Sequence, residues 1–404
     1  MTILETEGTV MESDWRDEYG RVMVGVFSTP RMLLTRGEGC YVWDDEGRRY
    51  LDFLAGIAVN ALGHAHPVLV DAVSRQIATL AHVSNYFATA PQLELAERLL
   101  RLSGAGDAGR VFFGNSGTEA IEAAFKLARL NRGDGERSRI LALNDSFHGR
   151  SMGALALTGK PGLRAPFEPM VAGVEHLDST VEALEAAVDD RVAALFVEPV
   201  KGEAGVVELP EGYLREARRL TAEHGALLIV DEIQTGVGRL GSWFGYQREG
   251  IVPDAIALAK GIAGGVPMGA LVTFGDASGL FTTGQHGTTF GGNPLAAAAS
   301  NAVLGEIERA DLVGNAARMG ERIRATIRAI GSPLVAELRG SGLLIGVGLS
   351  EPVSGPLADA AQRAGLIVNA PNPSSIRIAP PLIVGEAEVE EFGALFEHAL
   401  ESIA

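Results

Sequence analysis

Two apolar runs, each ending in a charged residue, constrain the fold of this chain most strongly. Residues 226–230 read Ala-Leu-Leu-Ile-Val and precede Asp231, and residues 255–259 read Ala-Ile-Ala-Leu-Ala and precede Lys260. Apolar runs of this length are typical of strands buried on both faces of a parallel sheet. Open sheets of this kind bind ligands at the carboxyl ends of their strands. We therefore expect Asp231 and Lys260 to meet in one crevice at that edge.

The pattern around these runs predicts the fold class. From about residue 67, helical segments alternate with short apolar runs, which lie at residues 110–113, 140–143, 193–197 and 270–274. This alternation predicts an α/β fold with a large, mostly parallel sheet and helices on both faces.

The two ends of the chain follow other patterns. The first 35 residues or so look irregular, and short strand patterns follow them. After about residue 295, helical and strand patterns are mixed. We predict that residues 1–66 and 296–404 together form a small α+β lobe beside a large domain of residues 67–295.

Composition narrows the class of partner. The 404 residues include 34 Lys and Arg against 51 Asp and Glu, and a net charge of −17 argues against binding nucleic acid or an anionic membrane. Cys40 is the only cysteine, which excludes a disulfide framework and suits a reducing compartment. The sequence shows no secretory signal and no apolar run as long as a membrane helix. We expect a cytoplasmic protein that acts on small molecules.

A lysine and an acid in one crevice suit the chemistry of pyridoxal 5'-phosphate. The lysine forms a Schiff base with this cofactor, and the acid keeps the pyridine nitrogen protonated. A lysine at a strand end is usually just a solvated charge. A carboxylate that ends a buried strand, however, needs a partner to offset its desolvation, and a pyridinium would supply one. We therefore take Lys260 and Asp231 as the candidate catalytic residues.

A glycine-containing turn supplies a candidate phosphate site. Residues 114–119 read Gly-Asn-Ser-Gly-Thr-Glu and connect a strand pattern to a helix that continues from Ala120. The N–H groups at a helix start bind anions, and the hydroxyl groups of Ser116 and Thr118 add donors. An ordinary capped turn would look the same. Together with Asp231 and Lys260, the turn favours phosphate binding.

Two arginines are candidates for binding a substrate carboxylate. Arg150 ends the motif Phe147-His148-Gly149-Arg150, whose aromatic ring can lie against a cofactor ring. Arg377 lies between Ile376 and Ile378 in a strand pattern, where it can point into a crevice. A core phenylalanine, a surface arginine and a solvent-facing edge strand would give the same patterns.

Two further motifs suggest other functions. Residues 236–241 match the dinucleotide fingerprint and follow a strand, but no amphipathic helix follows them, so a loop is favoured. A nicotinamide-dependent oxidoreductase remains the alternative from a different functional class. His64 and His66 lack a third ligand at a recognisable spacing, so we predict no metal site.

Taken together, the motifs resemble the class III, or ω-amino, aminotransferases of the pyridoxal phosphate fold type I group. The resemblance extends from about Phe27 to the C-terminus. It rests on residues 56–64, 115–120, 147–150, 197–199, 202–203, 231–236, 259–261 and 286–294.

The resemblance implies a fold type I homodimer and a role for each matched residue. Lys260 would carry the cofactor, Asp231 would contact the pyridine nitrogen, and Gln234 would lie near the ring hydroxyl. Phe147 and Ile233 would enclose the ring. The implied cofactor-binding set is Ser116, Gly117, Thr118, Phe147, Asp231, Ile233, Gln234, Lys260 and Thr289, with Thr289 reaching the phosphate of the neighbouring subunit.

The resemblance also implies a reaction: transfer of the δ-amino group of N-acetylornithine to 2-oxoglutarate, as in arginine biosynthesis. Arg150 and Thr288 would contact substrate, and Glu203 would mask Arg377 while the amine donor reacts. Ornithine, succinylornithine and 4-aminobutyrate are the alternative donors. Ile57 weighs against ornithine, because ornithine-specific relatives carry an aromatic residue there.

Overall fold

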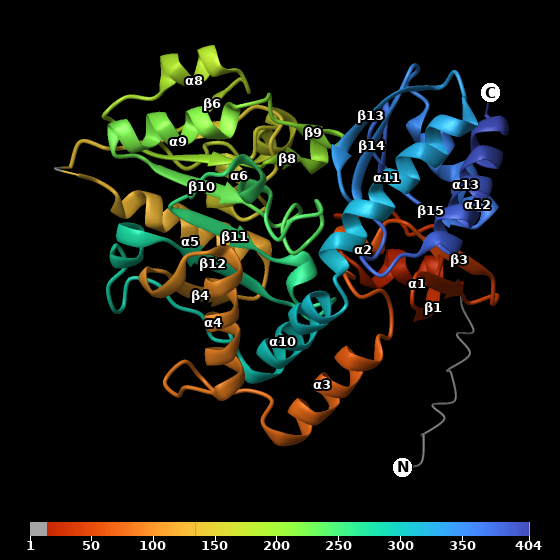
Figure 1. Ribbon diagram of the computed structural model, residues 1–404, viewed down its shortest axis with the longest axis horizontal. Coiled ribbons are helices and arrows are strands. Elements are labelled where there is room, and N and C mark those ends of the chain that lie inside the picture. Colours follow the sequence, from red (N-terminus) through yellow and green to blue (C-terminus); the bar gives the residue numbers. More distant parts are fainter. Residues whose placement is uncertain (1–13, 134, 404) are drawn as a thin grey trace.

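The computed structural model describes residues 14–133 and 135–403. Figure 1 shows a large α/β part beside a smaller part, in which the red N-terminal and blue C-terminal segments lie together. Over these two ranges, no helix is both long enough and apolar enough to cross a membrane.

A seven-stranded sheet forms the centre of the large part. In spatial order its strands are β4 (Arg110–Gly114), β12 (Gly269–Thr273), β11 (Ala255–Leu258), β10 (Leu227–Asp231), β7 (Val192–Val197), β5 (Arg139–Leu143) and β6 (Val174–Leu177). β10 pairs in parallel with β7 and β11, whereas β12 runs antiparallel to β11 and β4. The predicted mostly parallel α/β sheet is confirmed. The sequence pattern missed β6.

Both faces of this sheet are buried. Leu228 and Val230 of β10 belong to one apolar cluster, and Leu227 and Ile229 belong to the cluster on the opposite face. A strand covered on both faces needs apolar residues at every position, which explains the uninterrupted run. Helices of the large part include α3 (Pro67–Thr79), α4 (Ala90–Ser103), α5 (Gly117–Leu130), α6 (Met152–Leu157), α7 (Pro161–Arg164), α8 (Val181–Ala187), α9 (Tyr213–His224) and α10 (Pro294–Arg309).

Strands from both ends of the chain pair in the small part. β3 (Arg49–Asp52) runs parallel to β15 (Leu366–Ile367), in a sheet that also contains β1 (Leu34–Glu38) and β2 (Tyr41–Asp44). A second sheet holds β13 (Val335–Ser341), β14 (Leu344–Leu349), β17 (Ser375–Ile378) and β16 (Asn369–Asn372). Its helices are α11 (Leu312–Ile330), α12 (Ser354–Ala364) and α13 (Glu386–Glu401), and the strands β8 (Val200–Lys201) and β9 (Val207–Glu208) form a separate hairpin. The boundaries at residues 66 and 295 stay a prediction.

The N-terminal region differs from the expectation. Part of the segment that looked irregular is a helix, α1 (Trp15–Val22). Its N-cap residue is Asp14, whose side chain accepts a hydrogen bond from the Arg16 N–H. None of the residues of α1 is buried. Its sequence therefore has no core-facing apolar stripe of the kind that reveals a helix.

Candidate active site

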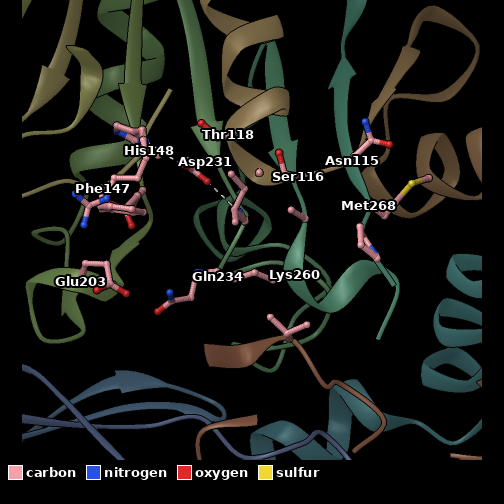
Figure 2. A pocket seen from close by; sticks show the side chains of 18 of the residues that line it. Asn115, Ser116, Thr118, Phe147, His148, Glu203, Asp231, Gln234, Lys260 and Met268 are labelled. Atoms are coloured by element: carbon pink, nitrogen blue, oxygen red, sulfur yellow. Dashed lines mark hydrogen bonds and ion pairs between the residues drawn. The ribbon is translucent and has the colours of Figure 1, made fainter. Parts of the chain in front are cut away.

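A cavity of about 430 Å³ lies at the carboxyl ends of β10 and β11. Figure 2 shows Asp231, Lys260 and Gln234 at its centre, with Phe147 and Glu203 to one side and Asn115 and Ser116 to the other. The predicted residues that line it are Ser116, Gly117, Thr118, Phe147, Arg150, Glu203, Asp231, Ile233, Gln234 and Lys260.

Asp231 ends β10 and is buried, with 4% of its surface exposed. Its Oδ2 lies 2.8 Å from Nδ1 of His148, and its Oδ1 accepts a hydrogen bond from the Ile233 N–H at 3.0 Å. Burial disfavours the imidazolium form of His148, but the bond to Asp231 and the charges of Asp231 and Glu198 outweigh this and raise its pKa. These contacts fix the carboxylate so that it faces the cavity.

The contact between His148 and Asp231 was not predicted from the sequence. His148 lies inside the motif at residues 147–150, but no role was assigned to it. The sequence marks His148 only by its position beside Phe147. No sequence pattern indicates its partner Asp231, which is 83 residues away.

Lys260 begins a short 3₁₀ helix, η5 (Lys260–Ile262), with a positive φ of 46°. Such a conformation is costly for a residue with a side chain and often marks a functional site. Burial, followed by the charge of Arg377, lowers the pKa of Lys260 to about 8. At pH 7 roughly a tenth of this amine is therefore uncharged and able to act as a nucleophile, far more than for an ordinary lysine.

Glu198 is a second buried carboxylate on the cavity wall. Its Oε1 accepts a hydrogen bond from the Phe147 N–H at 2.8 Å. Burial raises its pKa to about 7, with His148 opposing the shift. The acid therefore holds the segment that carries Phe147.

The start of α5 fits the phosphate of the predicted cofactor. Ser116 caps this helix by accepting a hydrogen bond from the Glu119 N–H at 3.3 Å. Within residues 14–133 and 135–403, the N–H groups of Gly117 and Thr118 have no acceptor. A Cβ atom at Gly117 would lie 2.8 Å from Cδ1 of Ile233, so glycine keeps the space above the helix start open. Free N–H groups at an open helix start suit an anion.

Arg377 lies on β17 with 1% of its surface exposed; it does not itself line the cavity, but it contacts two residues that do. Its Nη1 forms an ion pair with Oε1 of Glu203 and lies 3.1 Å from Oε1 of Gln234. Burial alone would raise the pKa of Glu203, but the guanidinium outweighs it and lowers that pKa. This pair is therefore not an exposed surface ion pair. Gln234, expected near a ring hydroxyl, lines the cavity and also accepts a hydrogen bond from Arg377.

Arg150 is exposed, and its guanidinium lies 5.7 Å from the centre of the Phe147 ring. Thr288 and Thr289 do not line the cavity. The Thr288 hydroxyl oxygen accepts a hydrogen bond from the Gly291 N–H at 3.1 Å, and Thr289 is exposed. Within one chain, therefore, Thr289 is not brought to the cavity.

A left-handed turn, α2 (Ala55–Ala58), lies next to the cavity. Its four residues have φ values of 51°, 64°, 65° and 61°, although Gly56 is its sole glycine. Oδ1 of Asp52 accepts hydrogen bonds from the N–H groups of Leu54 and Ala55, and its Oδ2 lies 2.8 Å from Nε2 of His64. Val59, directly after the turn, lines the cavity. The structure thus gives His64 a partner in Asp52.

Residues 236–241 form turns and a bend. This agrees with the loop predicted from the absence of an amphipathic helix pattern after them. Arg239 is buried there, and its guanidinium donates to the backbone carbonyl groups of Leu343 and Pro380. This loop therefore connects the large part of the molecule to the small part, and its glycines do not open a dinucleotide-binding helix.

Comparisons with known proteins agree with this site. The family model for Aminotransferase class-III matches residues 24–400. A Streptomyces coelicolor protein named acetylornithine aminotransferase is 53% identical over 372 residues, which cover 91% of each chain. A Mycobacterium tuberculosis protein of the same name is 48% identical over 402 residues, covering 99% of this chain and 98% of its own.

Solved structures share the whole fold. An ornithine aminotransferase from Toxoplasma gondii superposes with a TM-score of 0.93 at 29% identity and covers 100% of this chain and 99% of its own. An N-acetylornithine aminotransferase from Stenotrophomonas maltophilia gives a TM-score of 0.82 at 34% identity and covers 93% and 97%. The family model spans nearly the whole chain, and relatives with 53% and 48% sequence identity cover 91% and 99% of it. The chain therefore belongs to the class III aminotransferases.

Proposed function

We propose that this chain transfers the δ-amino group of N-acetylornithine to 2-oxoglutarate, giving N-acetylglutamate 5-semialdehyde and glutamate. The observation that carries the proposal is one cavity in which Lys260 and Asp231 lie near an arginine already paired with Glu203. The full-length relatives named acetylornithine aminotransferase support the choice of donor.

Class III aminotransferases use pyridoxal 5'-phosphate. When bound, this cofactor supplies an aldehyde that accepts an amino group and a ring that withdraws electrons from the reacting carbon. The N–H groups of Gly117 and Thr118, with Ser116 beside them, would hold its phosphate. Phe147 and Ile233 would lie against its ring.

Two residues carry the protons in this proposal. Lys260 has an amine whose lowered pKa lets it act as a nucleophile and, in its neutral form, remove a proton from the reacting carbon. Asp231, fixed by His148, would keep the ring nitrogen protonated. Its buried position strengthens this interaction, because little water screens it.

The pairing of Arg377 with Glu203 accounts for two unlike substrates. N-acetylornithine has no carboxylate beside its reacting amine, so a free arginine there would lack a partner. Glu203 would pair with Arg377 in that half-reaction. The carboxylate of 2-oxoglutarate or glutamate would displace Glu203 in the other half-reaction and form a bidentate contact. Arg150 would contact the remaining substrate groups, and Thr288, which does not line the cavity of its own chain, would do so from a second copy of the chain.

The working unit in this proposal is a homodimer. The side chains of Tyr86, Phe87 and Phe290 are 92%, 67% and 59% exposed, and Asn85 joins their two segments through the Thr288 carbonyl oxygen at 3.3 Å. Exposed aromatic groups gathered in this way mark an interaction surface. A second copy would cover them, and Thr289 would then reach the partner's phosphate.

A panel of amine donors tests the function. The rate constant kcat/KM is measured for N-acetylornithine, ornithine, succinylornithine and 4-aminobutyrate at fixed 2-oxoglutarate. We expect N-acetylornithine to exceed each of the others by about tenfold or more, a ratio that one or two specific contacts can supply. A faster reaction with another donor would reassign the substrate. Colourless protein with no visible absorbance, together with nicotinamide-dependent turnover, would reassign the class of enzyme.

A further inference from the structure

Glu122 of α5 is a carboxylate close to the candidate site that none of the assigned roles uses. It is half-buried, and its Oε1 accepts three hydrogen bonds from one neighbouring segment. The donors are the Ser151 hydroxyl at 2.5 Å and the N–H groups of Gly153 at 2.8 Å and Ala154 at 3.1 Å. This carboxylate therefore fixes the start of α6 against α5.

The same contacts set the direction of a chain of hydroxyl groups. Oγ of Ser151 lies 2.6 Å from Oγ1 of Thr118, which is one turn before Glu122 on α5. An ionised carboxylate can only accept, so the single hydroxyl proton of Ser151 points to Glu122. The Thr118 hydroxyl then donates to Ser151, so its single proton is not available to a phosphate, which is left to the N–H groups of Gly117 and Thr118. A charge one helical turn away thus orients a side chain at the phosphate end of the cavity.

Two glycines allow this close contact. A Cβ atom at Gly149 would lie 2.6 Å from Oγ1 of Thr118, and a Cβ atom at Gly153 would lie 2.4 Å from Oε2 of Glu122. Any larger residue at either position would push the segment away from α5. That segment follows directly after Phe147 and contains Arg150. The position of both side chains therefore depends on its contact with α5.

We propose that Glu122 is a positioning residue that joins the two ends of the cavity. Through Ser151 it orients the Thr118 hydroxyl at the phosphate end, and through the N–H groups of Gly153 and Ala154 it holds the segment that carries Arg150 at the substrate end. The inference rests on the proposed assignment of those two ends. The simpler alternative is that Glu122 only caps α6 and contributes to stability alone.

The test compares Glu122→Gln, Ser151→Ala and the double variant as purified holoenzymes. Cofactor retention is measured as the dissociation constant for pyridoxal 5'-phosphate, and kcat and KM are measured separately for 2-oxoglutarate. We expect each single variant to tighten retention by a few-fold, because the Thr118 hydroxyl proton is no longer held by Ser151 and can be donated to the phosphate. KM should rise by about tenfold, because the segment that carries Arg150 is held less firmly, while kcat changes by less than about threefold. The double variant should differ from the wild type no more than the more affected single variant does, because both changes break the same chain.

Two control variants separate positioning from folding. Ser151→Thr keeps the hydroxyl and should restore retention and KM. Glu216→Gln removes a half-buried carboxylate on α9, outside the cavity lining, that pairs with Arg219, and should change neither quantity. If the melting temperature falls but retention and KM stay unchanged, if retention weakens, or if the effects of the two changes add fully in the double variant, the proposal is wrong. Retention requires no amine donor, so the proposal can succeed even if N-acetylornithine proves not to be the substrate.

Discussion

The floor of the cavity and its rim are built differently. The floor consists of Asp231 at the end of β10, Lys260 just after β11 and Gly117 at the start of α5. The Asp231 carboxylate is held on both oxygen atoms within one chain. We use rim for two segments outside the floor: the left-handed turn at residues 55–58, next to the cavity, and the loop at residues 286–290, which does not line the cavity within one chain.

This difference implies that the floor carries out the reaction, whereas the rim sets the preference among substrates. The floor follows from general rules of parallel sheets and helix starts, so any member of the fold can build it. The rim depends on costly backbone conformations and on exposed side chains that a second copy would cover. We expect changes in the floor to abolish the reaction, and changes in the rim to alter substrate preference, stability or assembly.

The largest effect is expected at the centre of the floor. Lys260→Ala removes the amine that carries the cofactor and moves the proton, so turnover should fall by about 10⁴-fold or more. The fold should be unchanged, and the phosphate end should still bind cofactor, because Gly117 and Thr118 are untouched. Activity assays and visible absorbance measure both results. A variant that keeps wild-type activity and absorbance would show that Lys260 does not carry the cofactor.

A smaller and selective effect is expected where floor and rim meet. Arg377→Ala should slow the half-reaction with glutamate by about 10²-fold, because charged hydrogen bonds to the substrate carboxylate are lost. Glu203→Ala should instead slow the half-reaction with N-acetylornithine by about tenfold, since it leaves Arg377 unmasked. Single-turnover kinetics with each substrate separate the two. Arg219→Ala, at an exposed pair on α9, is the control, and equal losses in both half-reactions would rule out masking.

The smallest effect is expected in the rim. Ile57→Gly removes a β-branched side chain from a left-handed conformation and should raise the free energy of unfolding by about 1 kcal/mol. Val59, two residues on, should become less firmly held, so KM for N-acetylornithine should rise a few-fold at most. Gly56→Ala is the matched opposite change, because its Cβ atom would make ordinary contacts with Asn60 at 3.4 Å and Val59 at 3.6 Å while φ stays at 64°. If Ile57→Gly destabilises the protein in thermal unfolding, the turn is not strained.

Most of the floor could be predicted from the sequence. Uninterrupted apolar runs identify buried parallel strands, and the residue after each run must lie at the ligand-binding edge. The turn at residues 114–119 was identified in the same way, by a strand pattern leading into a helix. Each of these signals lies within a short stretch of sequence, and the tertiary structure agrees with them here.

The contacts that support the floor could not be predicted in this way. His148 meets Asp231, and Glu122 meets Ser151, across separations that no periodic pattern encodes. The left-handed turn contradicts local preference, because Ile57 and two alanines occupy a region that usually requires glycine. The surrounding structure, including the Asp52 and His64 pair, imposes this conformation.

The central claim is that one chain completes the floor while a second copy completes the rim. Mixed dimers made of one Lys260→Ala protomer and one Thr289→Asp protomer test it most directly, because each parent dimer should be inactive. If Thr289 serves the partner's phosphate site, one of the two sites in each mixed dimer is intact, and purified mixed dimers should recover about half of the wild-type activity. Mixed dimers of Lys260→Ala and Asp231→Ala protomers, whose changes affect the same chain's floor, should recover none. Absence of recovery in the first pair, or an active monomer by light scattering, would contradict the account.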